Sequence, residues 1–269
     1  MRGRLIVSLL LGFASLGGLA QDTGKDIRTR ATLFGVGFRN TLDTYFTPYN
    51  YKGVEVRFLQ ERERSIKPIV FGKKFKRRWK RISSFSLDVD FCGSPSGESD
   101  ILGGMFQYEM SWLLPFRLGG RWNLHIGPAW CSHLGFAYNT LGGNNPAQAY
   151  VATNIGVDAV ISYTLSSRLS LRLKGTMPCL GVMFSPNYTQ SYYEIFSLGN
   201  YDHNVCFTNL FQAFSARGLL TLDIKLRSST LRLGYLCEIR QSEVNSLKRH
   251  DWSHLFVIGY VKRFKVLDP

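Results

Sequence analysis

Histidines that neighbour a serine or a second histidine are the residues of this 269-residue chain whose spacing could do chemistry. His133 directly follows Ser132, and His250 precedes His254 by four residues. A serine becomes a nucleophile only beside a base that a third group orients, and no such third group completes either pair. Lone histidines in strands or loops are more often structural. We therefore expect no catalytic residue, no metal site and no cofactor.

The cysteines do not form a reactive or metal-binding set either. No CxxC motif and no Cys/His pattern with metal-ligand spacing occurs. We expect the cysteines to be small apolar fillers, with one chance disulfide as the alternative. Their number is odd and their spacing is wide: Cys92, Cys131, Cys179, Cys206 and Cys237.

The N-terminus has the order of a secretory signal peptide. Two arginines precede an apolar run over residues 5–16, and small residues precede a cleavage site before Gln21. A membrane anchor is the alternative, but a spanning helix needs about 20 apolar residues. We expect residues 1–20 to be removed and residues 21–269 to form one domain.

Most of the remaining chain alternates apolar and polar residues, which is the pattern of a strand with two different faces. In Leu219–Arg227 the even positions are aliphatic, and the odd positions include Thr221, Asp223 and Lys225. Bacterial barrels have an even number of strands, so Ser191–Leu198 is the expected twelfth strand. The eleven segments that alternate are 31–39, 51–61, 83–91, 104–114, 122–137, 151–165, 169–184, 206–215, 218–227, 230–240 and 253–264.

Alternation fits a soluble barrel or sandwich as well as a membrane barrel. Export favours the membrane, and so do strands as long as the roughly 9–11 residues that a tilted membrane strand needs. Aromatic residues near strand ends are typical of the girdles at membrane–water interfaces. We therefore expect an all-β, antiparallel transmembrane β-barrel of about twelve strands in the bacterial outer membrane. The girdle candidates are Tyr45, Phe46, Tyr49, Tyr51, Trp112, Trp122, Tyr188, Tyr192, Tyr193, Trp252, Tyr260 and Phe264.

The cost of placing charge in hydrocarbon decides which face of each strand is outside. An Arg or Lys on the lipid face at mid-bilayer costs about 2–4 kcal/mol. Several together would exceed the stability of a whole domain, about 5–15 kcal/mol. The aliphatic rows must therefore face lipid and the charges the lumen. The expected lumen-lining residues are Asp88, Asp90, Glu109, Asp158, Arg172, Lys174, Asp223, Lys225, Arg232 and Glu238.

The net charge is +14, and positive charge is densest in Lys67–Arg81, KPIVFGKKFKRRWKR. A solvated loop is one interpretation, because runs of like charge are usually exposed. The other is a contact with anionic lipid through Lys73, Lys74, Lys76, Arg77, Arg78, Trp79, Lys80 and Arg81. Exported proteins rarely meet nucleic acid. The expected partners are therefore outer-membrane lipids and lipopolysaccharide, beside small solutes or a surface or periplasmic protein.

The connections between strands differ in length. Short links such as Ser166–Arg168 and Ser228–Ser229 are typical of periplasmic turns. The longer polar links at 92–100, 138–148 and 241–252 are typical of external loops, since they contain turn-forming Gly, Asn, Pro and Ser.

Four stretches carry a resemblance to a known family. They are GVMFSPNYTQSYYEIFSLGN (Gly181–Asn200), YNTLGGNNPAQAYVATN (Tyr138–Asn154), STLRLGYLCEIRQSEVNSLK (Ser229–Lys248) and the closing SHLFVIGYVKRF. The chain resembles an uncharacterised outer-membrane barrel family common in Bacteroidetes, known only as a domain of unknown function. The resemblance implies export and a membrane location, and it implies no activity.

One stretch is also similar to outer-membrane phospholipase A, a twelve-strand family in which an Asn-oriented His activates a Ser nucleophile. Tyr188–Ser191 (YTQS) resembles that family's first motif with the serine shifted, while His203 lacks the Ser and Asn-Gly of the second motif. We expect an outer-membrane barrel of unassigned activity, structural or a passive channel, and not an enzyme. The alternatives are a lipid hydrolase and a surface-interaction barrel.

Overall fold

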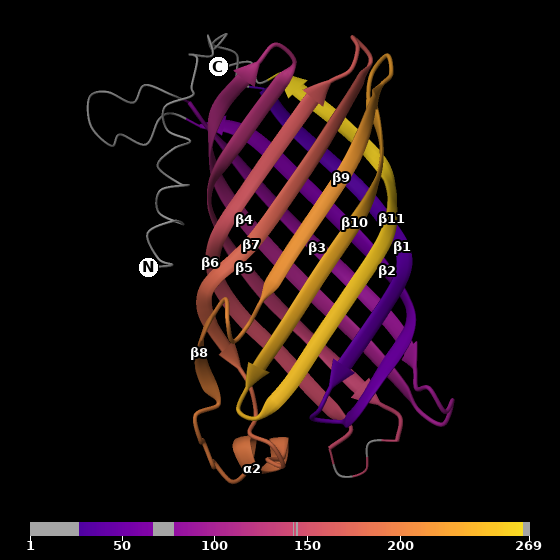
Figure 1. The fold of residues 1–269 in the computed structure, drawn as a ribbon, viewed down its shortest axis with the longest axis vertical. Coiled ribbons are helices and arrows are strands. Elements are labelled where there is room, and N and C mark those ends of the chain that lie inside the picture. Colours follow the sequence, from indigo (N-terminus) through magenta and orange to yellow (C-terminus); the bar gives the residue numbers. More distant parts are fainter. Residues whose placement is uncertain (1–26, 67–77, 142, 144, 266–269) are drawn as a thin grey trace, which may run out of the picture.

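The strands close into one antiparallel barrel (Figure 1). The computed structural model describes residues 27–66, 78–141, 143 and 145–265. The hydrogen-bonded order is β6-β5-β4-β3-β2-β1-β11-β10-β9-β7, and a further β6–β7 pairing closes the ring. The strands are β1 (Ile27–Asp43), β2 (Thr47–Ile66), β3 (Trp79–Gly93), β4 (Asp100–Gly119), β5 (Trp122–Asn139), β6 (Ala147–Thr164), β7 (Leu169–Phe184), β8 (Val205–Asn209), β9 (Ser215–Lys225), β10 (Thr230–Val244) and β11 (Leu247–Lys265), and α2 (Tyr192–Phe196) is a short helix.

The predicted all-β antiparallel barrel is confirmed. Ten of the eleven strands in the described residues form the wall, while β8 pairs only with the end of β7. The total is thus close to the expected twelve. No helix in the described part of the chain is long and apolar enough to cross a membrane.

The expected twelfth strand, Ser191–Leu198, is wrong, because most of it is the helix α2. Ser191 and Glu194 form a capping box: the Ser191 side chain accepts from the Glu194 amide, and the Glu194 side chain accepts from the Ser191 amide. This reciprocal pair satisfies two donors that a helix start leaves open, and it favours a helical turn over an extended segment.

The predicted strand 206–215 is also wrong in part. β8 ends at Asn209 and β9 begins at Ser215. Both run antiparallel to β7, β8 along Leu180–Phe184 and β9 along Leu169–Thr176. The residues between them, 210–214, are therefore looped out of the ladder at a position where the wall would otherwise continue.

The predicted external loop 241–252 is wrong, because the hairpin β10–β11 runs through it with register pairs up to Val244↔Leu247. Asn245 and Ser246 both have positive φ, 51° and 59°. A type I′ hairpin turn requires this left-handed conformation at both central residues, and Asn tolerates it better than most residues.

Two ends of the barrel differ in their connections. Ile27 pairs with Lys265, so β1 begins and β11 finishes at the same end, which we name the terminal end; the opposite end is the distal end. At the terminal end β4–β5, β6–β7 and β9–β10 are joined by short turns. The distal end carries the longer β3–β4, β5–β6 and β7–β8 connections, the last of which contains α2 (Figure 1).

Glycines allow β1 and β11 to approach closely where the ring closes. A Cβ at Gly259 would collide with the backbone carbonyl of Thr32, and a Cβ at Gly37 would collide with that of His254. Glycine in a strand interior commonly marks such a close approach or a tight bend of a barrel. The β1–β11 seam therefore depends on the absence of a side chain at these positions.

We predict that Gly259→Ala lowers the free energy of unfolding by about 1–3 kcal/mol, because the added Cβ must displace the β1 backbone. Urea unfolding of the purified barrel in detergent micelles measures the change. Gly218→Ala is the matched control, since a Cβ there meets open space and mainly restricts the unfolded chain. Equal losses in both variants would contradict the close approach.

Candidate functional site in the barrel lumen

The interior of the barrel holds a continuous set of buried ion pairs, which we name the lumenal network. Every wall strand except β5 contributes at least one charged side chain to it, because inward positions recur at every second residue. The charges nearly balance. Among the residues that the structure describes, its ion pairs include ten carboxylates and nine cations: Glu55, Glu61, Glu63, Asp88, Asp90, Glu109, Asp158, Asp223, Glu238 and Asp251, with Arg39, Arg57, Lys80, Arg172, Lys174, Arg217, Arg232, Arg240 and Arg249.

Arg39 is the centre of the distal half of the network. Its guanidinium lies 3.0 Å from Asp251, 3.2 Å from Asp90 and 3.3 Å from both Glu55 and Asp88. Glu55 and Asp90 are direct cross-strand partners on β2 and β3, and like charges in that relation repel. Arg39 therefore stabilises an arrangement of carboxylates that would otherwise be unfavourable.

Glu61 has the corresponding place in the half nearer the terminal end. Its carboxylate lies 2.7 Å from Arg172, 3.1 Å from Lys174 and 3.7 Å from Arg232. Lys174 in turn lies 2.5 Å from Glu109. A buried charge is costly unless it is paired and hydrogen-bonded, so these groups depend on one another.

Gln107 joins the two halves. Its amide oxygen accepts from Arg217 at 2.8 Å, and its amide nitrogen donates to Glu238 at 3.3 Å. Arg217 also pairs with Glu109, and Glu238 pairs with Arg57 at 2.6 Å. The polar contacts thus extend without a break from Asp251 near the distal end to Lys80 near the terminal end.

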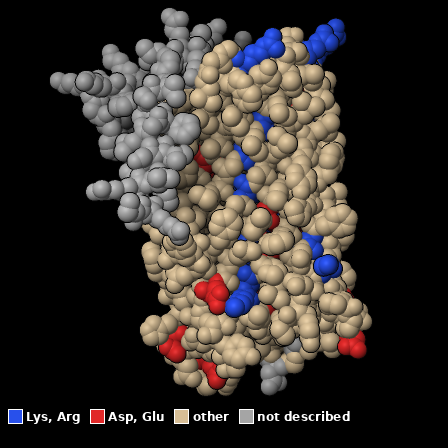
Figure 2. All heavy atoms as spheres, in the orientation of Figure 1, with Lys and Arg blue, Asp and Glu red and all other residues tan. Residues whose placement is uncertain are grey.

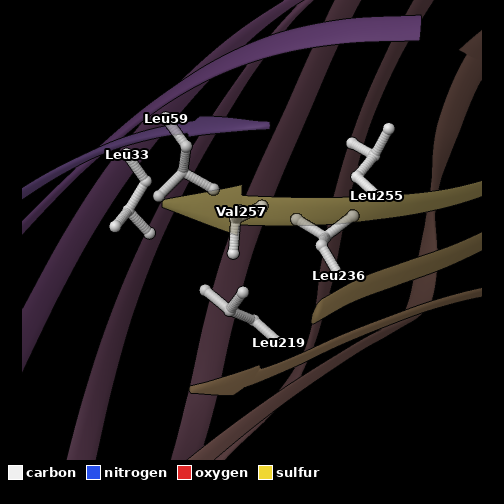
Figure 3. Close-up of a cluster of buried hydrophobic side chains, with 6 residues drawn as sticks. All are labelled: Leu33, Leu59, Leu219, Leu236, Leu255 and Val257. Carbon is white, nitrogen blue, oxygen red and sulfur yellow. The ribbon is translucent and has the colours of Figure 1, made fainter. Parts of the chain in front are cut away.

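Aliphatic side chains fill the space beside these charges. One cluster joins five wall strands and consists of Leu33, Leu59, Leu219, Leu236, Leu255 and Val257, and Figure 3 shows the six side chains gathered in one space. A smaller cluster of Ile82, Leu113 and Val160 is also fully buried. In the described part of the barrel the lumen is therefore filled with side chains, as in narrow barrels.

The structure places nine of the ten residues expected to line the lumen inside the barrel, buried and ion-paired. Glu55, Arg57, Asp88 and Asp158 are at most 1% exposed, although only the last two were expected there. Lys225 differs, because it lies at the exposed end of β9. Each of the nine stands at an inward position of an alternating segment, which is the signal that selected it.

Several network members were missed by the sequence prediction. Glu61 and Glu63 continue the inward parity of Glu55 and Arg57 along β2, so the same alternation could have found them. Arg39 has a weaker signal, because glycines rather than polar residues precede it on the inward face of β1. A search for alternating apolar and polar residues does not recognise an inward face that is made partly of glycine.

The basic run is only partly within the described residues. Lys73, Lys74, Lys76 and Arg77 lie outside them. Trp79 begins β3, and Arg81 stands in its outward row at the terminal end. Lys80 faces inward and lies 3.1 Å from Glu63. The structure therefore assigns Lys80 to the lumenal network rather than to a lipid contact.

The residues considered for catalysis are held in structural contacts. Ser191 accepts from the Glu194 amide, and its own amide and hydroxyl donate to the Glu194 carboxylate at 2.7 and 2.9 Å, which lowers the pKa of Glu194. Within the described part of the chain, Ser191 contacts no histidine. His203 lies 2.7 Å from the Asp202 carboxylate, and His254 bonds the Tyr235 hydroxyl at 2.5 Å. No Ser–His pair is assembled among these groups.

The cysteines and the aromatic residues have mixed placements. All five cysteines are unpaired, and Cys92 and Cys131 are buried. Trp122, Trp252, Tyr260 and Phe264 are exposed on the outside, near strand ends. Tyr51 is instead buried in the lumen with its hydroxyl 2.7 Å from Ser99, so its assignment to an outer girdle is wrong.

The outer surface of the barrel is aliphatic and aromatic. Phe34, Phe58, Leu87, Phe106 and Leu134 follow one another across five strands as direct register partners, and four of them are more than 40% exposed. Most of the face in Figure 2 is uncharged. The fold thus places apolar groups outside and charged groups inside, the reverse of a water-soluble barrel.

Comparisons with known proteins give a family and distant likenesses in fold. A family model described as "Protein of unknown function (DUF3316)" matches residues 5–269. No curated protein matches the chain.

Three solved structures illustrate the likenesses. The outer membrane protease OmpT from Escherichia coli is 6% identical with a TM-score of 0.47, over 93% of this chain and 100% of that one. The translocator domain of the autotransporter NalP from Neisseria meningitidis is 9% identical with a TM-score of 0.42, over 98% and 95%. Ail, the attachment invasion locus protein of Yersinia pestis, is 12% identical with a TM-score of 0.31, over 88% and 98%. At these values the likenesses carry no argument about function.

We predict that Glu61→Gln lowers the free energy of unfolding by about 3–5 kcal/mol, because it leaves buried cations without their carboxylate. Urea unfolding in detergent micelles measures the loss. Glu243→Gln is the matched control: Glu243 pairs with Lys248 at 3.5 Å with both side chains mostly exposed, so its loss should stay within about 1 kcal/mol. Similar losses in the two variants would contradict the account of the network.

Proposed function

The chain belongs to the DUF3316 family of proteins of unknown function, and we propose that it is an outer-membrane β-barrel whose packed lumen is closed to solutes. Its role is then structural or one of surface interaction, rather than passive diffusion. The observation that carries this proposal is the inverted distribution of side chains, with aliphatic rows outside and a nearly neutral ionic network inside.

A membrane location follows from the free energy of the outer surface. Soluble monomers rarely expose contiguous apolar patches beyond a few hundred Å². Five outward side chains on the continuous part of the wall from β1 to β6 are each more than half exposed: Phe34, Val56, Leu87, Leu134 and Ile155. Insertion into hydrocarbon is favoured by roughly 25 cal/mol of free energy for each Å² of apolar surface that leaves water.

A closed lumen is supported by the contacts that cross it. Arg172 on β7 reaches Glu61 on β2 at 2.7 Å, and Arg57 on β2 reaches Glu238 on β10 at 2.6 Å. Opening an aqueous path would require breaking several such pairs together. Buried pairs of this kind are strongly unfavourable to break singly, at about 3–5 kcal/mol.

Lipid hydrolysis is not favoured as an alternative. The hydroxyl of Ser191 takes part in the cap of α2, and the distal connection that holds it brings no histidine into contact with it. The proposal therefore assigns Ser191 a structural role.

The terminal end offers a place for anionic head groups. Arg30 and Arg62 are exposed register partners on β1 and β2, and Lys262 is the partner of Arg30 on β11. Juxtamembrane cations of this kind attract anionic lipid. Contact with lipid phosphates there is part of the proposal.

We predict that Leu87→Lys lowers the free energy of unfolding from lipid bilayers by about 2–4 kcal/mol, because Leu87 faces outward midway along β3 and a cation there must enter hydrocarbon. Tyr201→Lys is the control, since Tyr201 is exposed in the distal β7–β8 connection. Unfolding titrations of barrels folded into vesicles measure both. An unchanged or increased stability of Leu87→Lys would contradict the membrane location.

We predict that the reconstituted wild-type barrel gives no stable conductance steps in planar bilayers, since the lumenal network and the aliphatic clusters leave no continuous water path. An open porin in the same bilayer serves as the positive control. Sustained stepwise conductance from the purified protein would overturn the closed lumen and favour a channel.

A further inference from the structure

The barrel wall is split between β7 and β10 toward the distal end. Within the described strands, residues 177–179 of β7 have no ladder partner on the side of β8 and β9. β10 beyond Arg240 has left its pairing with β9, and on that side its amides donate only to the carbonyls of Phe214 and Gln212, at 2.7 and 2.8 Å. The wall therefore has two lips, β7 with β8 and β10 with the 210–214 loop.

A pocket lies at this split and reaches into the lumen. It holds about 90 Å³ of free space, which is room for a head group but less than the roughly 300–1,000 Å³ of sites that enclose a whole small molecule. Pro178, Thr208 and Phe214 come from the lips of the split, while Met105 comes from β4 and Tyr150 from β6. The pocket thus connects the inside of the barrel with its lateral surface.

Two arginines at the inner side of the pocket lack a full set of partners. Arg240 approaches the Asp251 carboxylate only to 3.9 Å, and its Nη1 lies 2.5 Å from the Met105 sulfur. Its Nε and Nη2 are buried without a hydrogen-bond partner. Arg249 lies 2.5 Å from Asp251, and its guanidinium stacks 3.2 Å above the Tyr150 ring, but its Nε has no partner either.

The carboxylate that both arginines approach, Asp251, is already paired with another cation. Asp251 pairs with Arg39 at 3.0 Å as well as with Arg249. Three arginines therefore share it, and the charged side chains that line the pocket, Arg240 and Arg249, are both cations with N–H donors that lack a partner. Unsatisfied donors in a buried site are unfavourable, and a bound anion would accept from them.

The remaining lining is apolar, and so is the surface outside the split. Met105, Met183 and Phe214 offer contacts to an alkyl chain, and methionine adapts to flexible chains. Outside, Leu180 and Phe207 are exposed on the β7–β8 lip. Arginine recognises carboxylate and phosphate through paired N–H donors.

We infer that this pocket binds the head group of a single-chain anionic amphiphile, which enters sideways through the split, pairs with Arg240 and Arg249, and extends its chain past Phe214 to the apolar outer surface. The inference rests on the proposed membrane location, because the split then opens to hydrocarbon. The Arg217–Glu109 pair and Gln107 lie beyond the pocket. The pocket is thus closed on its lumenal side and does not continue as a channel through the barrel.

A fluorescent fatty acid, dansylundecanoate, tests the site on the full-length folded barrel in dodecyl maltoside, with micelles alone as background. We expect one saturable site. Palmitate and 1-palmitoyl lysophosphatidic acid should displace the probe, and the stronger of the two identifies a carboxylate or a phosphate head group. Hexadecanol, which lacks the charge, should displace it about ten- to hundredfold less well.

Variants separate the head-group contact from the entrance. Arg240→Gln should weaken probe binding about ten- to hundredfold, whereas Arg168→Gln in the exposed β6–β7 turn should leave it unchanged. Ala213→Trp, which places a large side chain at the lip, should slow probe association about tenfold. The second variant keeps the test valid if Arg240→Gln does not fold.

Several results would overturn the inference. They are the absence of a saturable site above the micelle background, equal displacement by hexadecanol and palmitate, and Arg240→Gln or Ala213→Trp proteins that fold and bind as the wild type does. Flotation with phosphatidylglycerol-containing vesicles separates this failure from that of the proposed function. A barrel that floats without a saturable site refutes the pocket alone, and one that does not float refutes the membrane location first.

Discussion

The pairing of buried charge inside a closed ring is the constraint on which this structure depends. An open sheet with one aliphatic face and one ionic face is unstable in water and in a membrane alike. Water disfavours the aliphatic face, and hydrocarbon disfavours the ionic face. When β1 pairs with β11 and β6 pairs with β7, the sheet closes and the ionic faces of its strands contact one another inside the barrel. Arg39 and Glu61 then become hubs, since each satisfies partners from several strands at once. The barrel therefore closes only if the charges pair, and the charges pair only if the barrel closes.

The alternation of residues predicted the fold class and the direction of the side chains, because a period of two is imposed by the pleat of every strand. It selected Asp158, Arg172 and Glu238, which the structure places in buried ion pairs. The alternation did not identify the partners in each ion pair. Arg57 and Glu238 are 181 residues apart, and only the strand order brings them together. Arg39 was missed because glycines, and not polar residues, precede it on the inward face of β1.

Errors in the prediction arose where local chemistry outweighs periodicity. The aromatic segment at 191–198 was assigned to a strand, but the Ser191–Glu194 capping box starts a helix there. Residues 241–252 contain turn-forming types, yet two left-handed residues suffice for the hairpin. The looped-out residues 210–214 look like strand in sequence. Their departure from the ladder of β7 splits the wall and creates the pocket beside Arg240, a feature that follows from pairing geometry and has no sequence motif.

In the proposed membrane barrel, one face of each strand meets hydrocarbon and the other meets a packed interior. Nitroxide labels placed singly at Leu255, Phe256, Val257 and Ile258 of β11, in barrels folded into vesicles, test it through collision rates with oxygen and with a water-soluble nickel chelate. The account predicts high oxygen accessibility at Phe256 and Ile258, which are exposed, and low accessibility to both reagents at Leu255 and Val257, which are buried. Access of the nickel chelate to Phe256 and Ile258, or oxygen accessibility that does not alternate, would contradict it.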